Sequence, residues 1–146
     1  MQILYPYFLT LHLLCVIIFL GFIFTDVVLL SRLKKAFGEQ KTSEILTPVM
    51  KVGVKIMPVC VLLLVLSGGA MMSSYIGFSK GFFDTPLQTL LSIKIILALV
   101  IVCFVLNALC FKLVLKRANP LAAYTHKIVF CLGFVIVILA KFAFFV

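Results

Sequence analysis

The segment LQTLLSIKIILALVIVCFVLNALCF, residues 87–111, decides the fold class. It is a continuous apolar run with Lys94 as its single charged side chain, and a helix of this length crosses the roughly 30 Å of membrane hydrocarbon. A transmembrane β-barrel would instead show short segments of alternating hydrophobicity. The segment therefore predicts a transmembrane helix.

Three further apolar runs extend this prediction to the whole chain. The expected spans cover about residues 5–30, 55–75, 87–111 and 121–146. Of the 146 residues, 65% are hydrophobic and only four are acidic, which is too little polar material to cover a water-soluble domain. We predict a single all-α domain, residues 1–146, folded as a four-helix bundle in the lipid bilayer.

Basic residues between the apolar runs indicate the orientation of the helices. The loop between the first two spans is expected to be long and rich in lysine, and the loop between the last two is also basic. Positively charged loops are retained in the cytoplasm, so both termini are predicted to lie outside. The net charge of +9 then reflects membrane orientation, and nucleic acid is not an expected partner.

Local signals predict several details of the helices. The triplet TSE at residues 42–44 can cap a helix that leads into the second span. Pro58 predicts a kink in that span, and the glycine pair at residues 68–69 allows close helix approach near its outer end. Asp84 or Thr85 is expected near the start of the third span.

An outer layer of polar side chains is predicted inside the membrane, where such groups are costly and often functional. At about 1.5 Å per helical residue, His12 and Lys94 lie at similar depths. His12 could bind a metal or haem through neutral imidazole, or could hydrogen-bond to another helix. Lys94 could be an axial ligand, an anion clamp or a chain that snorkels to the surface. Further members of this layer are Lys141, which is expected to snorkel, and Met71, Met72 and Cys15.

Sulfur-containing side chains on the second span offer soft ligands. With Cys15, which lies one turn from His12, the set comprises Met57, Cys60, Met71 and Met72. Such side chains could bind Cu(I), and ordinary packing is the alternative. The cysteine spacing indicates no disulfide framework, and no motif of a hydrolase or a nucleotide-driven pump is present.

Three polar residues near the cytoplasmic ends of the spans form a predicted inner layer: Asp26, Asn107 and His126. His12 and Asp26 are fourteen residues apart, so they are expected to face nearly the same way. Asp26 could pair with His126, or it could bind Arg32 or Lys127 near the surface. We favour the second alternative.

Two segments resemble the copper resistance D (CopD) membrane domain. They are HLLCVIIFLGF, residues 12–22, and residues 85–109, with a central lysine and a late asparagine; SGG at residues 67–69 resembles the glycine motif of the family's second span. The resemblance implies a bacterial inner-membrane protein with periplasmic termini. It also implies that the protein binds or transports copper.

The chain also resembles, more distantly, the HemJ-type protoporphyrinogen oxidases, which are four-span haem b proteins. His12, Lys94 and Lys141 match an early histidine, a lysine in the third span and a lysine near the C-terminus of that family. This resemblance implies a haem b redox protein with His12 as axial ligand, and any enzymatic activity would be that of a haem-dependent oxidoreductase. A third alternative is a structural subunit, in a homo-oligomer or in a larger membrane complex.

Overall fold

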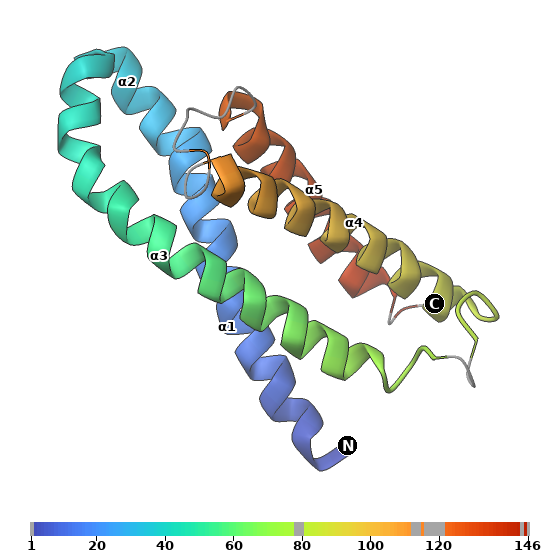
Figure 1. Ribbon diagram of the computed structural model, residues 1–146. Coiled ribbons are helices and arrows are strands. Elements are labelled where there is room, and N and C mark those ends of the chain that lie inside the picture. The colour runs from blue at the N-terminus through green and yellow to red at the C-terminus, as the bar shows by residue number, and fades with distance from the viewer. Residues whose placement is uncertain (1, 78–80, 112–114, 116–121, 144, 146) are drawn as a thin grey trace.

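The computed structural model describes residues 2–77, 81–111, 115, 122–143 and 145, and it is helical throughout most of these ranges (Figure 1). Four helical segments are long and apolar enough to cross a membrane: Tyr5–Phe37, Glu39–Met72, Pro86–Leu109 and Tyr124–Phe142. The described part of the chain contains no β-strand. The predicted all-α fold, with four helices long and apolar enough to span a membrane, is therefore confirmed.

The first span is longer than predicted and changes its helical type on the way. Helix α1, Tyr5–Phe24, passes into a π-helical turn, η2, Thr25–Leu30, and then into α2, Ser31–Phe37. A short 3-10 turn, η1, Gln2–Leu4, precedes α1. Because a π turn closes its hydrogen bonds over five residues instead of four, η2 widens the helix locally.

A single residue, Gly38, joins α2 to α3, Glu39–Met72. Its φ of 81° lies in the left-handed region, which glycine adopts without a steric penalty. The expected long loop is therefore wrong, since its basic residues lie on the two helices that Gly38 joins, α2 and α3. The predicted cap at residues 42–44 is also wrong: Thr42 lies inside α3, where its hydroxyl donates to the Gly38 carbonyl at 2.7 Å.

The second span continues as a helix through both of its prolines, Pro48 and Pro58. The third, α4, Pro86–Leu109, begins as predicted: the Thr85 hydroxyl oxygen caps it by accepting the backbone N–H of Gln88 at 3.2 Å. The fourth, α5, covers Ala122–Phe142. Positions 121, 144 and 146 of the expected last span lie outside the described residues.

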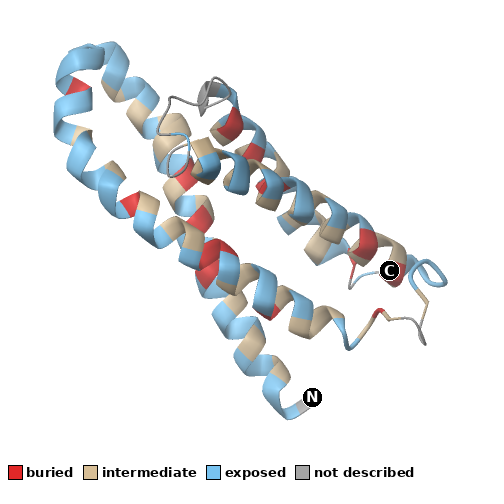
Figure 2. Ribbon diagram, viewed as in Figure 1, coloured by how far each residue is buried: buried red, intermediate tan, exposed pale blue. Residues whose placement is uncertain are grey.

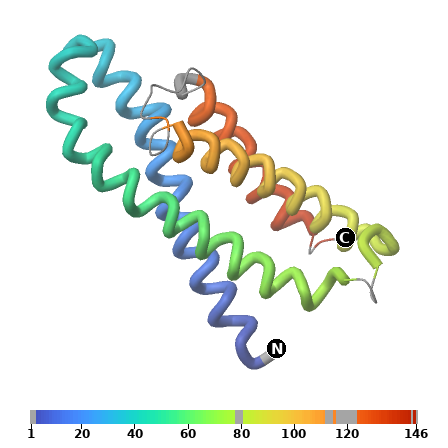
Figure 3. The backbone as a smooth tube through the Cα atoms, viewed as in Figure 1, coloured from blue at the N-terminus to red at the C-terminus, as the bar shows by residue number. Residues whose placement is uncertain are grey.

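The helices associate as two antiparallel pairs, α1 with α3 and α4 with α5 (Figures 1 and 3). Contacts of α5 with α1 and η2 join the pairs, whereas α3 and α4 touch little. Both termini lie toward the end where α3 connects to α4, which we call the termini end. The opposite end, where α2 meets α3, is the hairpin end.

The buried core is small and lies only where helices face one another (Figure 2). Its apolar centre consists of Phe19, Ile23, Val61, Ile101 and Val129. Most other leucine, isoleucine and phenylalanine side chains on the spans are partly or fully exposed. Helices that remain apolar on their outward faces are typical of membrane spans, so lipid is the solvent of this surface.

Candidate functional site

His12 lies on α1 and faces α3. Its Nδ1 atom is 2.9 Å from the Ser67 hydroxyl oxygen, and Ser67 is almost fully buried. The imidazole ring packs on Gly68, where a Cβ would lie only 3.2 Å from His12 Cε1. The absence of a side chain at Gly68 therefore lets the ring approach the α3 backbone.

The hydrogen bonds around Ser67 assign the proton on the imidazole of His12. The Ser67 hydroxyl donates to the Leu63 carbonyl at 2.6 Å, so its oxygen accepts the proton of His12 Nδ1. The carbonyl of Leu64 is a further acceptor within reach of the ring. The lone pair is then on Nε2, and neutral imidazole with a free lone pair is the form that binds metals.

Cys15 and Cys60 meet one turn from His12 toward the hairpin end. Both are buried, with 4% and 5% of their surface exposed. The Cys60 thiol donates to the Cys15 carbonyl oxygen, with the sulfur 3.9 Å from that oxygen, so the two cysteines meet across the α1–α3 contact. Together with His12, Ser67 and Gly68, they form what we call the α1–α3 seam.

The three remaining cysteines, Cys103, Cys110 and Cys131, are free and exposed on the sides of α4 and α5. The spacing of residues in the sequence could have distinguished the two buried cysteines from the three exposed ones. Cys60 and Ser67 are seven residues apart and His12 and Cys15 three, so each pair shares one face of its helix.

Lys94 is half-buried on α4 and lies within electrostatic reach of His12. The four aspartate and glutamate side chains of the chain all lie in its described part, and the only ion pair there joins Asp26 to His126. No acidic side chain therefore neutralises Lys94. A cation at membrane depth without a counter-ion is costly, so a negatively charged ligand near it would be stabilised.

The other predicted members of the outer layer lie apart from this seam. Lys141 is exposed near the end of α5, with its ammonium 5.0 Å from the centre of the Phe145 ring. Met71 and Met72 are half-buried in the last turn of α3. Among the predicted ligands, the structure thus groups His12 and Cys15 with Cys60.

The inner layer differs from the favoured interpretation. Asp26 binds Nδ1 of His126 across the contact between η2 and α5, so the preference for Arg32 or Lys127 as its partner is wrong. His12 faces α3 whereas Asp26 faces α5, so the two side chains do not face nearly the same way as expected. Their positions differ by about 40° of helical phase, and Asp26 also lies in the widened π turn.

Asn107, the third predicted member of the inner layer, is exposed on α4. It lines a shallow, mainly apolar surface groove together with Val100, Cys103 and Phe104. Helical phase places Asn107 on a different side of α4 from Lys94, and the exposed position of Asn107 is in keeping with that placement.

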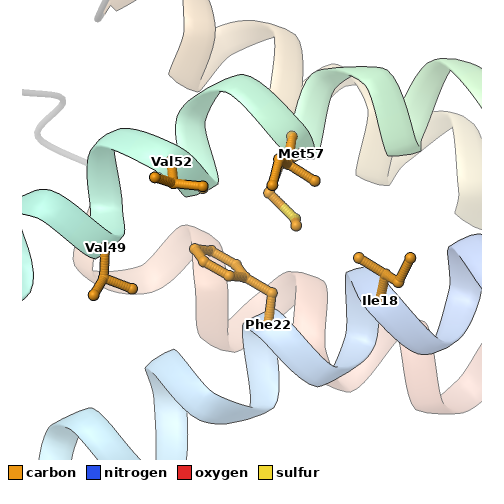
Figure 4. A pocket seen from close by; sticks show the side chains of 7 residues that line it. Ile18, Phe22, Val49, Val52 and Met57 are labelled. Carbon is orange, nitrogen blue, oxygen red and sulfur yellow. The ribbon is translucent and has the colours of Figure 1, made fainter.

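An open groove of about 450 Å³ lies between α1 and α3 nearer the hairpin end (Figure 4). Its lining is apolar and consists of Ile18, Phe22, Val49, Val52, Gly53, Ile56 and Met57. The Phe22 ring packs against Gly53, where a Cβ would lie 2.6 Å from the ring. The groove offers no polar side chain for chemistry, and it marks the second close approach of α1 to α3.

Within the described residues, no three histidine, cysteine or acidic side chains gather closely enough to hold a metal ion together. The donor set of the seam is therefore the thiol pair, with the His12 imidazole one turn away. Comparisons with protein-family models, curated proteins and solved structures find no match to this chain.

Proposed function

We propose that this protein binds Cu(I) within the membrane through Cys15 and Cys60. The observation that carries the proposal is that two buried cysteines of different helices meet, with the Cys60 sulfur 3.9 Å from the Cys15 carbonyl oxygen. Thiolates are soft ligands that select Cu(I), which is stable with two sulfur donors. His12, with its free Nε2 one turn toward the termini end, is a further donor along the same seam.

The charges around the seam support a bis-thiolate complex. Binding of Cu(I) releases the two thiol protons, and the two thiolates with one monovalent ion carry a net charge of −1. Lys94, which no acidic side chain neutralises, supplies the compensating positive charge near His12. A hydrophobic site with a matched charge avoids the cost of an isolated ion in lipid.

The resemblance to CopD is in keeping with a copper ligand, and on its basis we place the protein in the inner membrane of a bacterium. We propose that the hairpin end is cytoplasmic and that both termini are periplasmic. Four basic side chains lie near the hairpin, in keeping with the positive-inside rule: Arg32, Lys34, Lys35 and Lys41. Lys51 and Lys55 follow further along α3.

The test is a Cu(I) titration of the purified protein in lipid nanodiscs against a chromophoric Cu(I) chelator. We expect about one tightly bound Cu(I) per chain. Cys15→Ala and Cys60→Ala should each weaken binding at least tenfold, because a single thiolate remains. The matched control is Cys131→Ala, which removes an exposed thiol and should leave the affinity unchanged.

Equal weakening by Cys131→Ala, or unchanged affinity in both seam variants, would contradict the proposal. The double variant Cys15→Ser/Cys60→Ser keeps the volume of the seam nearly constant, so a loss of copper in that variant without a loss of helicity separates ligand removal from unfolding.

A haem b site on His12 is the second candidate, and the free Nε2 beside Lys94 favours it. Neutral imidazole is a common haem ligand, and an ammonium nearby would stabilise a propionate. This candidate predicts a coloured protein whose Soret band is lost in His12→Ala and kept in Cys15→Ala. A colourless protein that binds Cu(I) would exclude the haem site and support the Cu(I) site.

A further inference from the structure

The open groove between α1 and α3 lies at a depth where lipid tails surround the protein. Its lining on α3 runs from Val49 to Met57, about 12 Å along the helix at 1.5 Å per residue. Phe22, which packs on Gly53, is eight residues before Leu30, the end of η2, and so lies about 12 Å from that end of the apolar segment. Since half of the hydrocarbon layer is about 15 Å thick, the groove faces the acyl chains of the leaflet at the hairpin end.

The walls of this groove are open to the lipid layer. Ile18, Val49, Val52 and Ile56 are each between 46% and 56% exposed, although they line a concave surface of about 450 Å³. The Phe22 ring lies between the two helices (Figure 4). The lining is apolar throughout, and its volume is comparable to that of one phospholipid acyl chain. The groove therefore has the size and the chemistry to hold a lipid tail.

Two lysines stand beside the groove on the same stretch of α3. Lys51 and Lys55 are both exposed and are four residues apart, so they share one side of the helix. Lys55 is three residues from the lining residue Val52, and such positions are neighbours on a helix surface. Lysine side chains are flexible and long enough to carry the ammonium group toward the membrane surface. Both ammonium groups can therefore reach the headgroup of a lipid whose acyl chain lies in the groove.

The segment that contains these lysines carries an excess of positive charge. Residues 31–55 include six basic side chains and only two acidic ones. Neither Lys51 nor Lys55 forms an ion pair with a carboxylate of the described residues, which include all four aspartate and glutamate side chains of the chain. Basic clusters at a membrane surface attract anionic headgroups, so a lipid phosphate would supply the negative charge that the protein does not.

We propose that the groove binds an anionic phospholipid, with one acyl chain along its apolar lining and the phosphate at Lys51 and Lys55. A zwitterionic lipid offers the same acyl chain, but the cationic end of its headgroup offsets the attraction of its phosphate to the lysines. The lipid site does not depend on the proposed copper site, because it uses neither Cys15 nor Cys60 and is measured on the metal-free protein.

A helix of a second copy is the competing occupant of the groove. It fits less well for two reasons. The groove is only about 12 Å long, which is two turns of a helix. An apolar helix docked there would also cover two cations that have no counter-ion, and such cations are costly in lipid.

The first test measures lipid contact with a single tryptophan, since the chain has none of its own. Ile18→Trp places the fluorophore at the inner end of the groove. Leu99→Trp, the matched control, places it on an exposed side of α4, where no charged side chain follows before the helix ends at Leu109. Phospholipids with brominated acyl chains quench tryptophan on contact. We expect phosphatidylglycerol to bind at least fivefold more tightly than phosphatidylcholine at Ile18→Trp, and both to bind about equally at Leu99→Trp.

The charge of the site is tested in the Ile18→Trp background. Lys51→Gln/Lys55→Gln should reduce the preference for phosphatidylglycerol to less than about twofold, because the phosphate loses both partners. Lys34→Gln/Lys35→Gln removes the same charge from the last turn of α2 and should keep at least half of the preference.

The control lysines on α2 are far enough from the groove to serve this purpose. The carbonyl oxygen of Leu33, beside them, lies 3.5 Å from the Thr42 hydroxyl. Thr42 is nine residues before Lys51, or about 14 Å along α3. This separation exceeds the Debye length of about 8 Å at physiological ionic strength.

Equal binding of the two lipids at Ile18→Trp, or the same preference at Leu99→Trp, would overturn the proposal. A preference that survives Lys51→Gln/Lys55→Gln would also overturn it. Absence of quenching by either lipid at Ile18→Trp would do the same, because it would show that protein, such as a helix of a second copy, covers the groove.

The second test uses the chain without a tryptophan. In an uncharged detergent, phosphatidylglycerol should raise the melting temperature of the metal-free protein by several degrees more than phosphatidylcholine, because a ligand that binds only the folded state stabilises it. The difference should disappear in Lys51→Gln/Lys55→Gln and remain in Lys34→Gln/Lys35→Gln. An equal effect of the two lipids on the wild type would contradict the anionic-lipid site.

Discussion

The five cysteines all lie on apolar segments of the spans but divide between two regions of the molecule. On the α1–α3 seam, Cys15 and Cys60 are buried and face each other; on α4 and α5, the cysteines point outward from the bundle. At Gly53 and Gly68 an aromatic or imidazole ring of α1 packs directly on the α3 backbone. The two soft donors on α1 and α3 therefore meet at a contact where small residues let the helices approach, and the three exposed cysteines lie outside such a contact.

Among the variants that test the α1–α3 contact, Gly53→Ala is expected to have the largest effect on the free energy of unfolding. The added Cβ would lie 2.6 Å from the Phe22 ring, so the ring must move and α1 must separate from α3. Overpacking of this kind costs about 1–3 kcal/mol. The free energy of unfolding in mixed micelles measures it.

Gly69→Ala is the matched control for that variant, because nothing lies within 4 Å of its added Cβ. It should not destabilise the protein. The cost of Gly53→Ala should also shrink in a Phe22→Leu background, where the aromatic ring is gone. Equal stabilities of the two alanine variants would show that α1 and α3 do not approach closely at Gly53.

A smaller effect is expected from Ser67→Ala, which removes the acceptor of the His12 Nδ1 proton. Hydrogen bonds between membrane helices contribute about 0.6 kcal/mol on average and at most about 1.7 kcal/mol. We expect a loss in that range in the same unfolding measurement. Ser31→Ala, which removes an exposed hydroxyl bonded only within its own helix, should change less. A larger loss in Ser31→Ala than in Ser67→Ala would contradict the assigned role of Ser67.

The smallest effect on stability is expected on the outward faces of α4 and α5. Serine at Cys103, Cys110 or Cys131 should change the free energy of unfolding by no more than about 0.5 kcal/mol, as is usual for surface positions. In the wild type, a lipophilic maleimide should modify these three thiols quickly and Cys15 and Cys60 slowly, as peptide mass spectrometry can show. Fast modification of Cys60 would contradict its burial.

Much of the fold could be predicted because the cost of polar groups in lipid is large. Four apolar runs long enough to cross the bilayer predict four helices, because a helix satisfies its own backbone hydrogen bonds in lipid. The cap at Thr85 is predicted because a threonine hydroxyl accepts a backbone N–H of the first helical turn. The hairpin end was predicted wrongly because its charged segment reads as a loop. In fact a single left-handed glycine, Gly38, reverses the chain between two long helices.

The site was predicted less completely, because partners on different helices depend on helix rotation. His12, Cys15 and Cys60 were identified as candidates by residue type, but the sequence did not specify that the two cysteines meet. His126 was one of two alternatives for the partner of Asp26 but not the favoured one, because a π turn changes the direction of the side chain and leaves no clear signal in the sequence.

X-ray absorption at the copper edge, on Cu(I)-loaded protein in nanodiscs, tests the central claim most directly. We predict a ligand shell dominated by sulfur in the wild type, retained in Cys131→Ala and lost in Cys15→Ser/Cys60→Ser. A shell of nitrogen and oxygen alone in the wild type, or a sulfur shell that survives in the double variant, would contradict the assignment of Cu(I) to Cys15 and Cys60.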